Sequence, residues 1–80
     1  MDRFPDYFEV IRRGDDFTEL CSRNTGHFWM IVRSTDGARY PIQLYHKYER
    51  RLGFHFQRYG RDLPGTLRYI MAHDRYILGK

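Results

Sequence analysis

The sequence predicts an α+β domain in which an antiparallel β-meander of three to five strands packs on one C-terminal helix. Two patterns carry this prediction. Residues 27–59 hold three runs rich in β-branched and aromatic side chains, which are typical of strands, with turn signals between them. Residues 62–79 instead repeat apolar side chains at helical spacing. Because the chain has 80 residues and no linker or repeat, residues 1–80 are expected to form a single domain.

The N-terminal stretch fits two descriptions. Phe4, Phe8 and Ile11 lie at helical spacing, which would suit a short helix. The same stretch would also suit a strand that ends at the Gly-Asp-Asp turn of residues 14–16. We favour the strand, because residues 17–22 alternate between polar and apolar side chains and can pair back as a hairpin.

Three further strands are predicted in the middle of the chain. The run at residues 27–33 is followed by Asp36-Gly37, and Asp-Gly between two such runs is a strong hairpin signal. Residues 38–48 alternate with period two, but Pro41 cannot donate to a strand ladder, so this strand is expected at an edge or with a bulge. After a charged turn, residues 54–59 form the next expected strand.

The C-terminal segment carries the signals of a helix at both ends. Asp62 is a natural N-cap, and Pro64 is tolerated in a first turn. Gly79 stands where a C-terminal cap is expected. One stripe of the helix would hold Leu67, Ile70, Met71, Asp74, Ile77 and Leu78, with Asp74 as the polar exception.

Alternation along the strands sorts their side chains onto two faces. We expect the helix to cover the more apolar face, which holds Phe28, Met30, Val32, Ile42, Leu44, Phe54 and Phe56. The opposite face would then mix rings and cations, and a bulge at Pro41 would flip part of this assignment. The predicted binding surface consists of Trp29, Arg33, Arg39, Tyr45, Lys47, His55, Arg58 and Tyr59.

Charge and aromatic content favour a polyanionic partner. Residues 1–25 carry four basic and six acidic residues, whereas residues 26–80 carry ten basic and four acidic ones. Aromatic residues make up 18% of the chain, which is more than an 80-residue domain can bury. Exposed rings stack on bases, and arginine grips phosphate. We therefore expect a small basic protein that binds RNA, DNA or a nucleic-acid-processing complex.

A different class of function fits the same surface. Tyrosine, tryptophan and arginine are also enriched at protein interfaces. The chain could therefore be an inhibitor or adaptor that binds a nucleic-acid enzyme, of the type that phages and mobile elements encode, such as an anti-CRISPR protein. The same surface would also allow a homodimer.

Several other classes are not expected. No apolar run reaches membrane length, and the first residues do not form a signal peptide. The single cysteine, Cys21, allows no disulfide within the chain, so a cytoplasmic protein is expected. The four histidines show no metal-ligand spacing, so neither a metal nor a cofactor is predicted. Without a catalytic signature, we expect a protein that is not an enzyme.

A series of short motifs resembles one known family. The order of Thr25-Gly-His-Phe28, Asp36-Gly37, Tyr40-Pro-Ile42, His46 and the helix start at Asp62 is similar to that of HicA-type toxins. Those are small RNases with a fold like that of double-stranded RNA-binding domains, including a helix before the sheet. The resemblance implies RNA as the substrate and His27 as the catalytic histidine.

Overall fold

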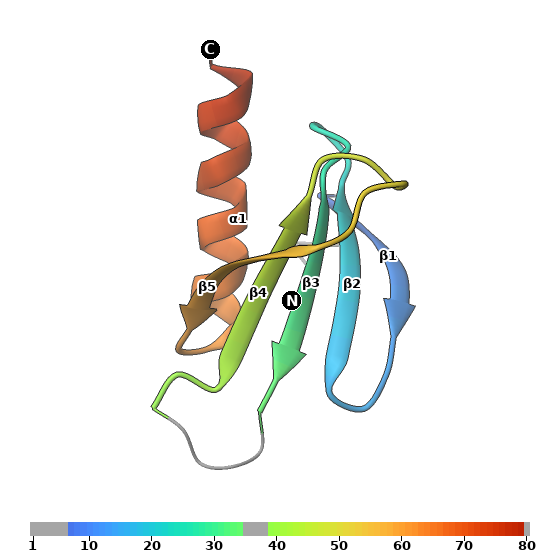
Figure 1. Ribbon diagram of the computed structural model, residues 1–80. Helices are drawn as coiled ribbons and strands as arrows, with labels where there is room; N and C mark the ends of the chain where they lie inside the picture. The colour runs from blue at the N-terminus through green and yellow to red at the C-terminus, as the bar shows by residue number, and fades with distance from the viewer. Residues whose placement is uncertain (1–6, 35–38, 80) are drawn as a thin grey trace.

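The computed structural model describes residues 7–34 and 39–79, so the predicted Asp36-Gly37 turn lies outside the described residues. Five strands form one antiparallel sheet in the order β1-β2-β3-β4-β5, and a helix follows them (Figure 1). The elements are β1 (Phe8–Arg13), β2 (Phe17–Ser22), β3 (Phe28–Arg33), β4 (Ile42–Lys47), β5 (His55–Gly60) and α1 (Leu63–Leu78). The predicted α+β meander with one C-terminal helix is confirmed.

The N-terminal segment forms a strand and not a helix. β1 pairs with β2 along its length, with a bulge between Val10 and Arg12. The N–H of Gly14 donates to the Phe17 carbonyl over 2.9 Å and closes the turn between the two strands. An isolated helix of this length is marginal in water, whereas strand pairing gives the backbone groups of both segments a partner.

The helix begins and ends at the predicted residues. The Asp62 side chain accepts a hydrogen bond of 2.8 Å from the N–H of Gly65, and Pro64 lies in the first turn. At the other end, the N–H of Gly79 donates to the Arg75 carbonyl over 2.9 Å. No helix in the described part of the chain is long and apolar enough to cross a membrane.

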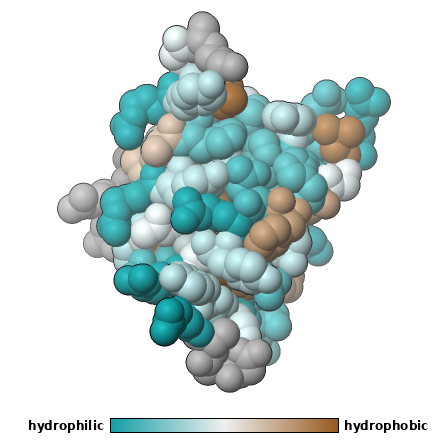
Figure 2. All heavy atoms as spheres, turned by 60° about the vertical axis from the view of Figure 1, so that its left-hand side comes forward, coloured by the Kyte–Doolittle hydropathy of each residue, from teal (hydrophilic) through white to brown (hydrophobic). Residues whose placement is uncertain are grey.

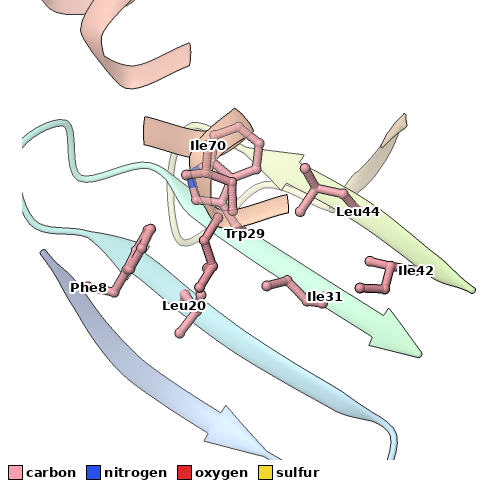
Figure 3. Close-up of a cluster of buried hydrophobic side chains, with 8 residues drawn as sticks. Phe8, Leu20, Trp29, Ile31, Ile42, Leu44 and Ile70 are labelled. Atoms are coloured by element: carbon pink, nitrogen blue, oxygen red, sulfur yellow. The ribbon is translucent and has the colours of Figure 1, made fainter. Parts of the chain in front are cut away.

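The hydrophobic core lies between the helix and one face of the sheet. Ile70 of α1 lies over Trp29 of β3, and apolar side chains from four strands surround this contact (Figure 3). The buried cluster consists of Phe8, Leu20, Trp29, Ile31, Ile42, Leu44, Leu67 and Ile70. The predicted assignment of Ile42 and Leu44 to the face beneath the helix is therefore confirmed.

The predicted faces of the β3 residues, and of His55 and Phe56 in β5, are wrong. Trp29 is 0% exposed, although we expected it on the binding surface. It pairs with His46 across the β3–β4 ladder, and directly opposed residues lie on the same face of a sheet. Phe28, Met30 and Val32 therefore lie on the outer face, away from α1. The bulge between β4 and β5 likewise brings Phe56 opposite Tyr45, on that outer face.

The connection between β4 and β5 covers part of the outer face. It crosses in front of the sheet before it enters β5 (Figure 1). Lys47 Nζ lies 5.4 Å from the Phe28 ring centroid and 4.4 Å from that of Phe54, while the Arg50 guanidinium lies 5.3 Å from Phe28. Phe28 is only 7% exposed as a result. This part of the outer face is therefore covered by the chain itself and is not free to bind a partner.

Candidate functional site

A cleft lies where the end of β5 meets the first turns of α1. Its volume is about 400 Å³. The polar and aromatic side chains that line it are Tyr40, Arg58, Tyr59, Arg61, Asp62, Thr66 and Arg68. We call this the basic cleft, because three guanidinium groups face one carboxylate there, and that carboxylate is already the N-cap of α1. Hydrophilic residues cover most of this side of the molecule, with a few separate hydrophobic patches (Figure 2).

The three arginines of the basic cleft form no ion pair with another described residue. In residues 7–34 and 39–79, the ion pairs are Arg12–Glu19 and Arg51–Glu49, and neither involves the cleft. Arg58 lies over the Tyr69 ring at 4.6 Å and Arg61 lies over the Tyr40 ring at 5.8 Å. Stacking on a ring orients a guanidinium, and although Arg58 Nε also donates to the Tyr59 carbonyl over 3.2 Å, the terminal N–H groups of such a guanidinium can still bind an anion.

Three rings form a row beside the cleft on the outer face of β4 and β5. The centroids of Tyr45 and Phe56 are 5.7 Å apart, and those of Phe56 and Tyr59 are 4.9 Å apart. Phe56 is 46% exposed and Tyr59 is 56% exposed. We call these residues the aromatic row. Tyr59 belongs to the row and also lines the basic cleft, so the two features form one continuous surface.

The structure separates the predicted binding residues into several groups. Tyr45 and Tyr59 lie on the outer face as expected. Arg33, His55 and Arg58 are exposed, but they oppose Ile42, His46 and Leu44 and so share the face that α1 covers, contrary to the prediction. Arg39 is exposed before β4. Lys47 is half-buried across two rings, so it helps to cover the sheet. Trp29 is buried beneath the helix and cannot contact a partner.

The sequence did not reveal four members of this surface. We assigned Phe56 to the core, and Tyr40 was not part of the predicted binding surface. Arg61 lies in the turn before α1, and Arg68 lies on the helix itself. The alternation of side chains along a strand cannot predict the position of a residue on a turn or a helix. Arg61 and Arg68 come close to β5 only because α1 packs against this strand.

His27 lies away from this surface and forms part of a second constellation. Its Nδ1 is 3.0 Å from Nε2 of His46, which is buried as the strand parity predicts. His73 of α1 completes the group, and one ring nitrogen from each of the three lies within 4.8 Å of the others. The sequence predicted no metal site, since His27 and His46 are 19 residues apart and lie on different elements.

Burial governs the protonation of His27 and His46. Desolvation, followed by the neighbouring histidines, lowers the pKa of His46 to about 4. Desolvation also lowers the pKa of His27, although the Asp74 carboxylate opposes this effect. Both rings are therefore neutral at pH 7, and each neutral imidazole offers one nitrogen lone pair.

A buried carboxylate holds the chain around the histidines in place. Asp74 is 0% exposed, and its two oxygens accept hydrogen bonds from the Tyr7 hydroxyl at 2.8 Å and the Thr25 hydroxyl at 3.1 Å. The Thr25 oxygen in turn accepts a bond of 3.2 Å from the N–H of His27. Asp74, the polar exception in the helical stripe, therefore links α1 to the start of β1 and to the turn before β3.

Comparison with known proteins does not indicate a function for this chain. No family model, no curated protein sequence and no solved structure matches the chain. The resemblance to HicA-type toxins therefore depends on short sequence motifs alone. The helix expected from that resemblance is also not found before the sheet in the described residues, because residues 8–13 form β1.

Proposed function

We propose that the chain is a small, non-enzymatic protein that binds single-stranded nucleic acid along β5. Bases would stack on the aromatic row, and phosphates would enter the basic cleft. The observation that carries this proposal is the position of Tyr59, which belongs to both features. It joins three exposed or half-buried rings to three guanidinium groups that form no ion pair among the described residues. Proteins that bind single strands without sequence preference combine the same two elements.

The aromatic row and the basic cleft would contribute to affinity in different ways. A base stacked on an aromatic side chain contributes about 1–3 kcal/mol. Three arginine–phosphate contacts on a single strand would give a slope of about −2 for the logarithm of affinity against the logarithm of salt concentration. The Gln43 Oε1 atom already accepts a bond of 2.9 Å from Tyr45, and stacking suits every base, so we expect little sequence preference.

The single cysteine supports a reducing location, because one cysteine allows no disulfide within the chain. Cys21 is a free thiol, and burial raises its pKa, which keeps it protonated and poorly nucleophilic at neutral pH. We therefore place the protein in the cytoplasm, where single-stranded RNA and nucleoprotein enzymes are available as partners.

Fluorescence anisotropy with labelled oligo(dT) and oligo(U) tests the proposal. Tyr59→Ala and Phe56→Ala should each weaken binding about tenfold or more, because each removes a stacking platform. The double variant Arg61→Ala/Arg68→Ala should weaken binding and make the salt slope shallower by about 1.4. Arg13→Ala, which removes an exposed arginine at the opposite edge of the sheet, is the matched control and should bind as the parent does.

Two results would refute the proposal. The first is an absence of binding to either oligonucleotide at low salt. The second is a loss of affinity in the Arg13 control that equals the loss in the cleft variants, since binding would then reflect net charge alone. If nucleic acid is not bound, and a nucleic-acid enzyme co-purifies through the same residues, the surface is that of an inhibitor or adaptor.

A further inference from the structure

Three histidines converge from three separate parts of the fold. His27 directly precedes β3, His46 lies on β4 beneath the helix, and His73 lies on α1. One ring nitrogen from each lies within 4.8 Å of the other two. We propose that His27, His46 and His73 bind one Zn²⁺ ion, with a water molecule as the fourth ligand. This site is separate from the surface proposed for nucleic acid.

The spacing of the nitrogens suits a tetrahedral ion after small side-chain rotations. With zinc–nitrogen bonds of about 2.0–2.1 Å and tetrahedral angles, two ligand nitrogens lie about 3.3 Å apart. The His27–His46 pair is at 3.0 Å, and the widest pair in the cluster is no more than 4.8 Å apart. The distance between the His27 and His46 nitrogens must therefore increase by a few tenths of an ångström. The nitrogen of His73 must move closer to the other two by up to about 1.5 Å.

A hydrogen-bonded histidine pair accounts for only part of the cluster. In such a pair, the N–H of one neutral ring donates a hydrogen bond to the bare nitrogen of the other. This arrangement provides nothing for His73, whose Nδ1 is buried and has no hydrogen-bond partner among the described residues. A buried nitrogen without a hydrogen-bond partner destabilises the folded state. A metal ion bound to all three histidines would give His73 a bonded partner through the ring nitrogen that lies in the cluster.

The surroundings of the three rings are those of a metal centre. The Trp29 ring packs on His46 with a centroid distance of 4.2 Å and on His73 with a centroid distance of 5.2 Å. This apolar wall limits the access of water on one side. The fully buried carboxylate of Asp74 follows His73 in the chain and supplies negative charge near a divalent cation. Through Thr25, the same carboxylate also positions the backbone of His27.

Imidazole nitrogen is a donor that suits zinc, copper, iron and nickel, whereas magnesium and calcium prefer oxygen. Three protein ligands leave one position of a tetrahedral zinc ion to water, as in catalytic zinc sites. Because the ligands lie on α1, on β4 and before β3, a bound ion would cross-link the helix to the sheet. Binding to the folded state alone would then raise the melting temperature.

Zinc titration of untagged, chelator-treated protein tests the site. Calorimetry should give one Zn²⁺ per chain, and the melting temperature should rise with zinc concentration and return to its starting value with a chelator. His27→Ala and His73→Ala, which alter half-buried residues, should each weaken zinc binding by more than about 100-fold, which exceeds the usual effect of an outer-shell change. His55→Ala is the matched control, because His55 is exposed and lies outside the cluster.

The outcomes separate this site from the proposed nucleic-acid surface. Tyr59→Ala should bind zinc as the parent does, whatever its effect on oligonucleotides. If a ligand variant does not fold, visible absorption of the Co²⁺-loaded parent protein supplies the second measurement, since tetrahedral Co²⁺ absorbs far more strongly than octahedral Co²⁺. The proposal is overturned if the parent binds no zinc, if its Co²⁺ spectrum is octahedral, or if His55→Ala loses zinc as completely as His73→Ala.

Discussion

The hydrogen bond from Tyr7 to Asp74 offers a sharp test of how the fold is held together. Tyr7→Phe keeps the ring and removes the hydroxyl that donates to the buried Asp74 carboxylate over 2.8 Å. A hydrogen bond to a charged group contributes about 1.5–3 kcal/mol. We therefore expect the free energy of unfolding to fall by about 2 kcal/mol at pH 7, which for a domain of this size corresponds to about 8–16 °C in Tm.

The same hydroxyl makes a distinct prediction about pH. Burial, followed by effects that include the Asp74 carboxylate, raises the pKa of Tyr7 to about 12 from 10.0. The folded state therefore favours the neutral phenol, so this stabilisation is complete below pH 10 and is lost as the pH rises from 10 to 12. By pH 11 this pKa difference lowers the free energy of unfolding by about 1.4 kcal/mol, and partial exposure of the ring reduces the effect to about 1 kcal/mol.

Urea unfolding of the two proteins at pH 7, 9 and 11, followed by the fluorescence of the single, buried Trp29, measures both effects. The difference between the parent and Tyr7→Phe should be constant from pH 7 to 9 and then shrink by about 1 kcal/mol at pH 11. Tyr59→Phe removes an exposed hydroxyl and should change stability by less than about 0.5 kcal/mol at every pH. A difference that stays the same at pH 11 would show that Tyr7 does not donate to a buried carboxylate.

Three further predictions concern the fold and the basic cleft. Trp29→Ala should cost about 3–5 kcal/mol and leave the chain largely unfolded in circular dichroism at 25 °C, because the side chain is fully buried beneath α1. Gly60→Ala should lower the free energy of unfolding in urea by about 1–3 kcal/mol, since its Cβ would collide with Thr66 Oγ1, whereas Gly53→Ala meets open space and should be neutral. Asp62→Ala should cost about 1 kcal/mol as a lost N-cap, yet it should tighten oligonucleotide binding in anisotropy because it removes the carboxylate from the cleft.

Local patterns identified most elements of this protein. The caps at Asp62 and Gly79 are signals carried by single residues, and both lie at the ends of the observed helix. Residues 17–22 and 54–59 contain the alternation that a half-buried strand requires, and both segments form strands close to these bounds. The pattern before residue 14 suited both a helix and a strand, and pairing with β2 selected the strand.

The relative placement of the strands was decided by the tertiary structure. Alternation states which residues of one strand share a face, but not which of the two faces the helix covers. In β4 the more apolar parity is the core parity, whereas in β3 both parities are apolar, so the prediction placed Trp29 outside and Phe28 inside. The register Trp29↔His46 reverses this assignment. The bulge between β4 and β5 similarly moves Phe56 to the outer face.

The sequence by itself therefore determined the order of the elements, the helix ends and the excess of rings and arginines. Only the tertiary structure decided which of them meet. The basic cleft needs the turn after β5 and the start of α1 to come together, and the histidine cluster needs three elements that lie far apart in the chain. Such contacts have no local spacing to detect, because strand register and helix docking are set by the packing of the whole core.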